Sequence, residues 1–81
     1  MLFKPKTKYT YKLEIHGMRC GMCELHIENT IRKAVDVKKV VANRFKNLAT
    51  IYLNESLDIN KVKEAIEKTG YEVLNIEMEE K

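Results

Sequence analysis

Apolar and polar residues alternate near the beginning of the chain. The apolar positions Tyr9, Tyr11, Leu13 and Ile15 are separated by Thr10, Lys12, Glu14 and His16. A period of two places successive side chains on opposite faces of an extended chain, which is typical of a strand with one buried face. The pattern therefore predicts a strand over 9–16 whose apolar face meets the core.

Two later segments have apolar residues at helical spacing. These positions are Cys23, Ile27, Ile31 and Ala34 in the first segment, and Ile59, Val62, Ala65 and Ile66 in the second. Each set forms one stripe along a helix, as expected of a helix that packs against a core. Asp58 is a favourable N-cap for the second helix, and Gly70 is well placed to end it.

The remaining β-rich stretches complete the order of elements. The predicted elements are a strand over 9–16, a helix over 22–35, strands over 37–43 and 48–53, a helix over 59–69 and a strand over 72–78. This βαββαβ order is that of the ferredoxin-like α+β sandwich, in which an antiparallel four-stranded sheet carries both helices on one face. We expect a flexible basic lead-in over 1–8, one domain over 9–78 and a frayed tail over 79–81.

Length and charge narrow the functional classes. With 81 residues the chain has room for one domain and one modest core. The net charge of +3 permits attraction to an acidic partner but does not call for nucleic acid. No apolar run approaches membrane-spanning length, and the apolar start of residues 1–8 is too short for a signal peptide. We therefore expect a cytoplasmic protein without membrane insertion, in a compartment that keeps thiols reduced.

The candidate chemistry lies in residues 17–23, Gly-Met-Arg-Cys-Gly-Met-Cys, which we call the cysteine loop. Its two thiols, Cys20 and Cys23, are three positions apart at a helix entrance, so they can converge on one point. Thiolates are soft ligands that suit Cu(I), zinc or iron–sulfur clusters. The helix N-terminus and the Arg19 cation both favour thiolate over thiol.

By itself, the spacing of Cys20 and Cys23 leaves three interpretations open. The pair could bind a metal, act as a redox dithiol, or be two structural thiols that behave as small hydrophobes. A zinc site with four cysteines is excluded within one chain, because the sequence has two.

The surroundings of the cysteines resemble a known family. The segments that carry the resemblance are Gly17-Met18-x-Cys20-x-x-Cys23, Cys23-x-x-x-Ile27-Glu28-x-x-Ile31, Val37-x-x-Val40-x-x-Asn43 and Ala65-Ile66-Glu67-Lys68-Thr69-Gly70-Tyr71. Spread over about 9–78, they are similar to the heavy-metal-associated domain family. That family includes copper chaperones, N-terminal modules of metal-transporting P-type ATPases, and mercury-binding proteins.

The resemblance implies a metal carrier. Cys20 and Cys23 would hold one soft ion as paired thiolates, with Cu(I) as the leading choice and Zn(II) or Hg(II) as alternatives. Low coordination would let a partner thiol attack the ion, so a tight site could still exchange quickly. The implied acceptor is a metal-transporting P-type ATPase or a related metal-binding domain. We expect the carrier to be a monomer, with a metal-bridged dimer as the alternative.

Other residues near the cysteines are expected to support the site. The resemblance implies that Met18 packs inward and tethers the loop, although its sulfur could also be a third ligand. Met22 is expected at the surface, as a plain exposed residue, a weak ligand or a partner contact. Tyr71 is either a shield over a bound ion or an ordinary half-buried tyrosine. His16 and His26 could complete a zinc site, but solvent exposure is the expectation for both.

The chain departs from the family pattern at a few positions. Arg19 replaces a threonine, Asp36 replaces a glycine, and Arg44 and Phe45 replace small or apolar residues. These changes bear on metal identity and partner choice, because both depend on loop chemistry and surface charge. The lysines expected at the surface, some of them in a docking patch, are Lys33, Lys38, Lys39, Lys61, Lys63 and Lys68.

Two further classes remain as alternatives to the carrier. A dithiol–disulfide oxidoreductase could use the same cysteines, but thioredoxin-like proteins carry a proline opposite them, and Pro5 is the chain's one proline. An RNA-binding module of the same fold needs exposed aromatic residues on its first and third strands. Tyr9 and Tyr11 instead share the face assigned to the core, which leaves Tyr52. No set of nucleophile, base and orienting residue is visible, so we do not expect an enzyme.

Overall fold

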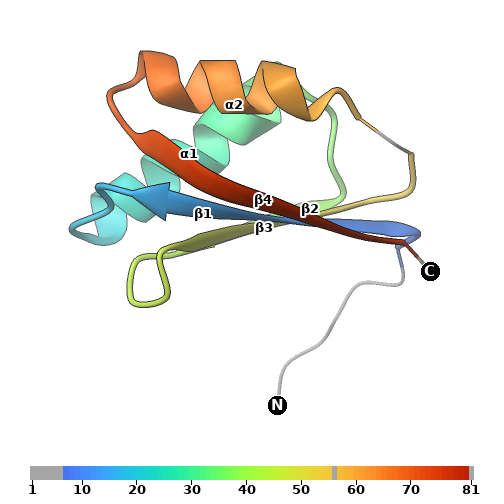
Figure 1. Cartoon of the computed structure of the whole chain (residues 1–81), viewed down its shortest axis with the longest axis horizontal. Coiled ribbons are helices and arrows are strands. Elements are labelled where there is room, and N and C mark those ends of the chain that lie inside the picture. Colours follow the sequence, from blue (N-terminus) through green and yellow to red (C-terminus); the bar gives the residue numbers. More distant parts are fainter. Residues whose placement is uncertain (1–6, 56, 81) are drawn as a thin grey trace.

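The computed structural model describes residues 7–55 and 57–80, which form an open-faced sandwich of a sheet and two helices (Figure 1). The elements are β1 (Tyr9–His16), α1 (Gly21–Ala34), β2 (Lys39–Asn43), β3 (Leu48–Leu53), α2 (Ile59–Lys68) and β4 (Glu72–Glu80). All strand pairs are antiparallel, in the order β2-β3-β1-β4, and both helices cover the same face of the sheet. The ferredoxin-like βαββαβ fold predicted from the sequence is confirmed.

The core lies between the helices and the apolar face of the sheet. Its largest fully buried side chains are Leu13, Ile15, Ile27, Ile31, Ile51, Val62 and Ile66. Tyr11 is buried and Tyr9 packs against the core at its edge, as the alternation in β1 predicts. The aromatic side chains of the first strand are therefore engaged in packing, not displayed on the open face as an RNA-binding surface requires.

Both helices have the predicted faces, with small differences at their ends. α1 begins at Gly21 and ends at Ala34, each one residue before the predicted boundary. α2 is capped by Asp58, whose Oδ1 accepts a hydrogen bond from the Asn60 N–H at 3.1 Å. Gly70 follows α2 with φ +101°, a conformation that a glycine adopts without the Cβ clash of other residues.

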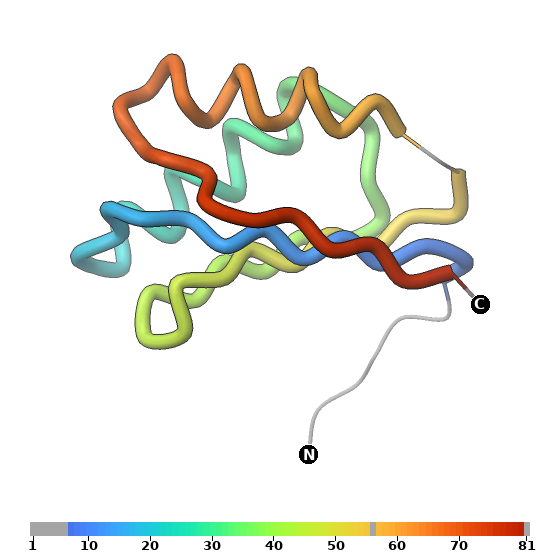
Figure 2. The backbone as a smooth tube through the Cα atoms, viewed as in Figure 1, coloured from blue at the N-terminus to red at the C-terminus, as the bar shows by residue number. Residues whose placement is uncertain are grey.

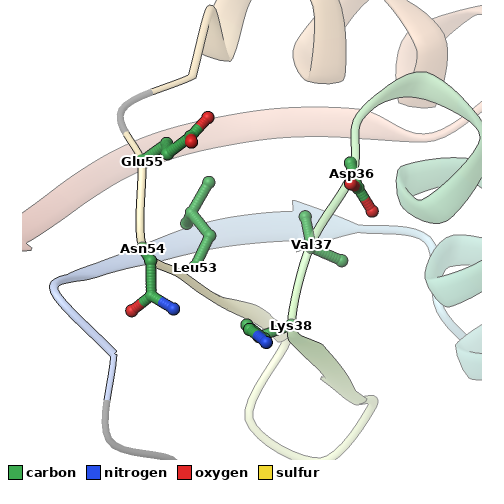
Figure 3. A pocket seen from close by; sticks show the side chains of 6 residues that line it. All are labelled: Asp36, Val37, Lys38, Leu53, Asn54 and Glu55. Carbon is green, nitrogen blue, oxygen red and sulfur yellow. The ribbon is translucent and has the colours of Figure 1, made fainter.

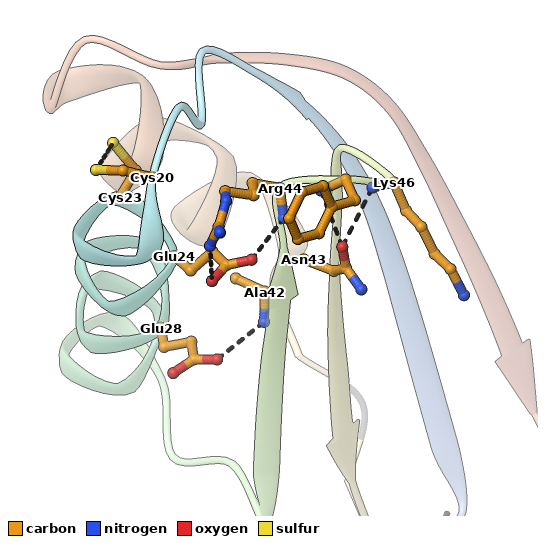
Figure 4. Close-up of polar contacts among 9 residues, drawn as sticks. Cys20, Cys23, Glu24, Glu28, Ala42, Asn43, Arg44 and Lys46 are labelled. Carbon is orange, nitrogen blue, oxygen red and sulfur yellow. Dashed lines mark hydrogen bonds and ion pairs between the residues drawn. The ribbon is translucent and has the colours of Figure 1, made fainter.

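The edge strand β2 is attached to α1 by two carboxylates (Figure 4). Glu28 Oε2 accepts a hydrogen bond from the Ala42 N–H at 2.9 Å, and Glu24 Oε2 accepts one from the Arg44 N–H at 2.7 Å. The Glu28 contact occupies an edge donor of β2 that would otherwise be open to another strand, and the Glu24 contact holds the residue that follows β2. The strand begins at Lys39, two residues later than predicted.

The ends of the described chain are more ordered than predicted. The frayed tail is wrong for Glu79 and Glu80, because they belong to β4 and pair with the beginning of β1. A Lys12–Glu79 ion pair of 3.3 Å adds a side-chain contact there. Lys81 and residues 1–6 of the predicted lead-in lie outside the described residues. Thr7 is buried, and the Lys8 N–H donates to Asn54 Oδ1 at 3.3 Å.

Three connections meet at one end of the domain: the cysteine loop, the β2–β3 turn and the α2–β4 turn (Figure 2). The Ile15 N–H donates to the Asn47 carbonyl at 2.8 Å, which joins the end of β1 to the β2–β3 turn. Tyr71 from the α2–β4 turn lies close to Gly17, where an added Cβ would be 3.2 Å from its ring. The fold thus assembles residues distant in sequence around the two cysteines. Over residues 7–55 and 57–80, neither helix has the length and apolar character needed to cross a membrane.

Candidate metal site

The two cysteines lie at the N-terminus of α1 with their sulfurs on the same side (Figure 4). Cys20 is the N-cap residue, with extended backbone angles, and its side chain does not cap the helix. Cys23 lies in the first turn, where its N–H donates to the Cys20 carbonyl at 3.1 Å. The Sγ atoms are 3.6 Å apart. Cys20 is exposed and Cys23 is half-buried, so one thiol faces solvent while the other lies against the core.

The pKa of the Cys23 thiol falls from 9.0 to about 7. The largest cause is a hydrogen bond from the backbone of Arg19, followed by the side chains of Tyr71 and Cys20, and all of them stabilise the thiolate. The sequence had pointed to the charge of the Arg19 guanidinium. That expectation is wrong in its cause, because Arg19 acts through its backbone.

Tyr71 faces Cys23 from the α2–β4 turn. Its interaction with the Cys23 sulfur, together with burial and the negative charge of the thiolates, raises the pKa of the phenol to about 12. The ring also lies against the backbone of Gly17. A Cβ at that position, where φ is +114°, would approach Tyr71 Cδ1 to 3.2 Å. The backbone angle favours glycine at this position, and any larger residue would in addition require the tyrosine ring to shift by a few tenths of an ångström.

The methionines and histidines of the region separate by burial. Met18 is 6% exposed and belongs to the core, whereas Met22 is 73% exposed. His16 and His26 are both exposed, as expected, and His26 lies beside Tyr71 with ring centroids 5.9 Å apart. Within the described ranges, no three His, Cys, Asp or Glu side chains come close enough to hold a metal together.

An ion pair at the rim of the site was not anticipated from the sequence. Arg44 Nη1 donates to Glu24 Oε1 at 3.1 Å, and its guanidinium carbon lies 4.4 Å from the centre of the Phe45 ring. Arg44 also lies over Gly21, where an added Cβ would be 3.7 Å from Nη1. The sequence marked Arg44 and Phe45 as departures from the family pattern, but their distance from Glu24 along the chain hid the contact.

A concave region lies away from the cysteines. It is an open pocket of about 430 Å³, lined by Asp36, Val37, Lys38, Leu53, Asn54 and Glu55 (Figure 3). Leu53 pairs with Tyr9 at the beginning of β1, whereas the cysteine loop follows the end of that strand. The pocket and the cysteine pair are therefore at opposite ends of the sheet.

Comparison with known proteins places the chain in a family. Residues 12–72 match the model of the heavy-metal-associated domain. The match covers most of the chain and includes both cysteines. The protein is a member of the heavy-metal-associated domain family.

Individual relatives agree with this assignment. Over 61 residues the chain is 38% identical to a copper-exporting P-type ATPase of Staphylococcus saprophyticus, a match of 75% of this chain and 8% of that protein. The chain thus spans a small fraction of that relative's length. Among solved structures it is similar to the CopZ metallochaperone, with a TM-score of 0.73, 26% identity and coverage of 80% and 98% of the two chains. It is also similar to the Cu(I)-loaded N-terminal domain of a potential copper-translocating P-type ATPase from Bacillus subtilis (TM-score 0.72, 26% identity, coverage 83% and 85%).

Proposed function

We propose that this protein binds one Cu(I) ion through Cys20 and Cys23 and passes it to a metal-transporting P-type ATPase or a related metal-binding domain. The observation that carries the proposal is the sulfur pair itself. Its atoms are 3.6 Å apart at a helix N-terminus, and the half-buried thiol has a pKa of about 7. At neutral pH a large share of Cys23 is already thiolate, the form that binds metal. Family membership and the copper-related names of the relatives support the choice of cargo.

The donor set favours Cu(I) over zinc. Two thiolates suit a soft monovalent ion, whereas zinc in structural sites takes four nitrogen or sulfur ligands. With metal–sulfur bonds of about 2.3 Å, sulfurs 3.6 Å apart subtend a bent angle of roughly 100° at the ion. A linear two-coordinate ion requires the sulfurs to separate by about 1 Å more. Rotation of the exposed Cys20 side chain can supply that movement while Cys23 stays against the core.

Transfer follows from the unequal exposure of the two thiols. An incoming partner thiolate reaches the ion from the Cys20 side and forms a third metal–sulfur bond. The Cys20–metal bond then breaks, a second partner thiolate binds, and Cys23 leaves last. Each step exchanges one thiolate for another, so no oxidant or reductant is needed. The rim residues Arg19 and Met22 are placed where they would meet the partner, and a rim charge acts mainly on the rate of encounter.

Native mass spectrometry under reducing conditions tests the cargo. Protein offered Cu(I), Zn(II) and Hg(II) in competition should carry one Cu(I), and the Cys20→Ser and Cys23→Ser variants should each lose it. If the protein instead loads preferentially with Zn(II) or Hg(II), that ion and not Cu(I) is the cargo. The same spectra distinguish the proposed monomer from a dimer bridged by the metal.

The dithiol oxidoreductase remains the competing class, and the structure weighs against it. The lowered pKa belongs to the half-buried Cys23, the less accessible thiol for attack on a protein disulfide. An insulin-reduction assay beside stopped-flow Cu(I) transfer separates the two. We expect transfer to an ATPase metal-binding domain and negligible turnover of insulin. The reverse pattern would assign the protein to redox chemistry. On the carrier proposal, the protein works in the reducing cytoplasm, is not an enzyme, and binds neither nucleic acid nor the membrane.

A further inference from the structure

His26 and Tyr71 form an aromatic pair beside the cysteines. Their ring centroids are 5.9 Å apart with an interplanar angle of 69°, which is an edge-to-face arrangement. His26 lies on α1, one turn beyond Cys23, and Tyr71 lies in the connection between α2 and β4. The pair therefore links the helix that carries Cys23 to the turn that carries Tyr71.

The surroundings of Tyr71 explain why such a contact matters. The ring lies close to Gly17, where an added Cβ would be 3.2 Å from Cδ1. Glycine offers a flat backbone surface but no side chain to confine the ring from the flank. The preceding residue, Gly70, has φ +101° and nothing within 4 Å of where its Cβ would be, so it adds no steric confinement. An aromatic edge on α1 supplies a favourable lateral contact.

We propose that His26 is a positioning residue that holds the Tyr71 ring over Cys23 and so limits access to that thiol. Its imidazole acts through the tyrosine ring and does not bind the metal. The effect on metal exchange rests on the proposed function, whereas the effect on the free thiol does not. The side chain is available for this role, because the hydrogen bond from Thr30 Oγ1 at 2.7 Å goes to the backbone carbonyl of His26.

Alkylation of the metal-free protein tests whether the His26–Tyr71 contact limits access to the Cys23 thiol. Cys20→Ser leaves Cys23 as the one thiol of the chain, and serine is a good N-cap for α1. In this background, His26→Ala should raise the rate of reaction with iodoacetamide roughly two- to tenfold, the range that an aromatic pair allows. His26→Phe should keep the original rate, because a phenyl ring preserves the edge-to-face contact. In a Tyr71→Ala background, His26→Ala should have no further effect. Circular dichroism of each variant verifies the fold.

The effect of the His26–Tyr71 contact on metal exchange is tested in protein with both cysteines, by the rate at which a chromophoric chelator removes Cu(I). His26→Ala should accelerate removal, His26→Phe should not, and Tyr71→Ala should abolish the difference. If His26→Ala still accelerates removal without Tyr71, and phenylalanine fails to rescue it, His26 is a metal ligand and the proposal is overturned. Unchanged alkylation in His26→Ala overturns it as well. A protein that binds no Cu(I) but shows the Tyr71-dependent alkylation pattern would refute the proposed function and retain the positioning role.

Discussion

Replacement of Met18 by alanine tests whether the cysteine loop is anchored in the core. The Met18 side chain is 6% exposed and packs in the buried cluster, so truncation to a methyl group removes most of an apolar side chain from that cluster. Buried methionine-to-alanine changes cost about 2–5 kcal/mol in free energy of unfolding, depending on how far the cavity collapses. Met18 lies in a loop, which can relax more easily than a helix or strand. We therefore expect the lower half of that range, about 2–3 kcal/mol.

The chain provides a matched control four residues away. Met22→Ala makes the same chemical change at a side chain that is 73% exposed, and surface substitutions of this kind stay within about 0.5 kcal/mol. Urea unfolding of the metal-free, reduced protein, followed by circular dichroism, measures both variants. For a domain of this size, the expected loss in Met18→Ala corresponds to a melting temperature roughly 8–24 °C lower.

If Met18 anchors the loop and is not a ligand, the Met18→Ala variant should still bind one ion per chain. If it were no less stable than Met22→Ala, Met18 would not anchor the loop. If it were stable but lost the ion, or if methyl NMR showed direct contact between Met18 and the metal, the residue would be a ligand and not a tether.

Three further predictions follow from individual residues. The folded-state pKa of Cys23 is lowered from 9.0 to about 7, so its thiolate should stabilise the metal-free fold at high pH. The free energy of unfolding should therefore fall as the pH drops from 9.0 through about 7. Urea titrations at a series of pH values measure this change, and Cys23→Ser should not show it. Gly70→Ala should lower the free energy of unfolding by about 1–2 kcal/mol through backbone strain alone. Gly17→Ala should lower it by more and shift the NMR resonances of the Tyr71 ring, because the new Cβ meets that ring. Equal losses of stability and unshifted ring resonances would contradict the close approach. Asp58→Ala should lower stability by about 1 kcal/mol through loss of the α2 cap, and Asp58→Asn, which can still cap, should lose much less in the same assay.

Local patterns in the sequence predicted most of the fold. The alternation in β1 assigned Tyr11 and Leu13 to the core, and helical spacing assigned Ile27 and Ile31, because burial of one face depends only on the period of each element. The end of β4 was not predicted, because no side-chain pattern marks it. Glu79 and Glu80 look like a solvated tail by composition, but their pairing with β1 is made by the backbone and does not depend on side-chain type.

The candidate site was predictable only in part. The cysteine pair and the helix entrance follow from sequence spacing, and the place of Tyr71 came from resemblance to a family. The contacts that tune the site are tertiary. The largest cause of the lowered Cys23 pKa is a hydrogen bond from the Arg19 backbone, whereas the sequence pattern indicated the charge of the Arg19 side chain. The edge-to-face contact of His26 joins segments far apart in the chain, so no local pattern could indicate it.

The central claim is that the paired thiolates form the Cu(I) site. A titration of the reduced protein against a strong chromophoric Cu(I) chelator tests it directly, with the Cys20→Ser, Cys23→Ser double variant as the comparison. The sulfurs 3.6 Å apart predict that the unmodified protein withdraws one equivalent of Cu(I) from the chelator, and that the double variant, folded by circular dichroism, withdraws none. Withdrawal of one equivalent by the folded double variant would contradict the account, because the ion would then be held by other residues.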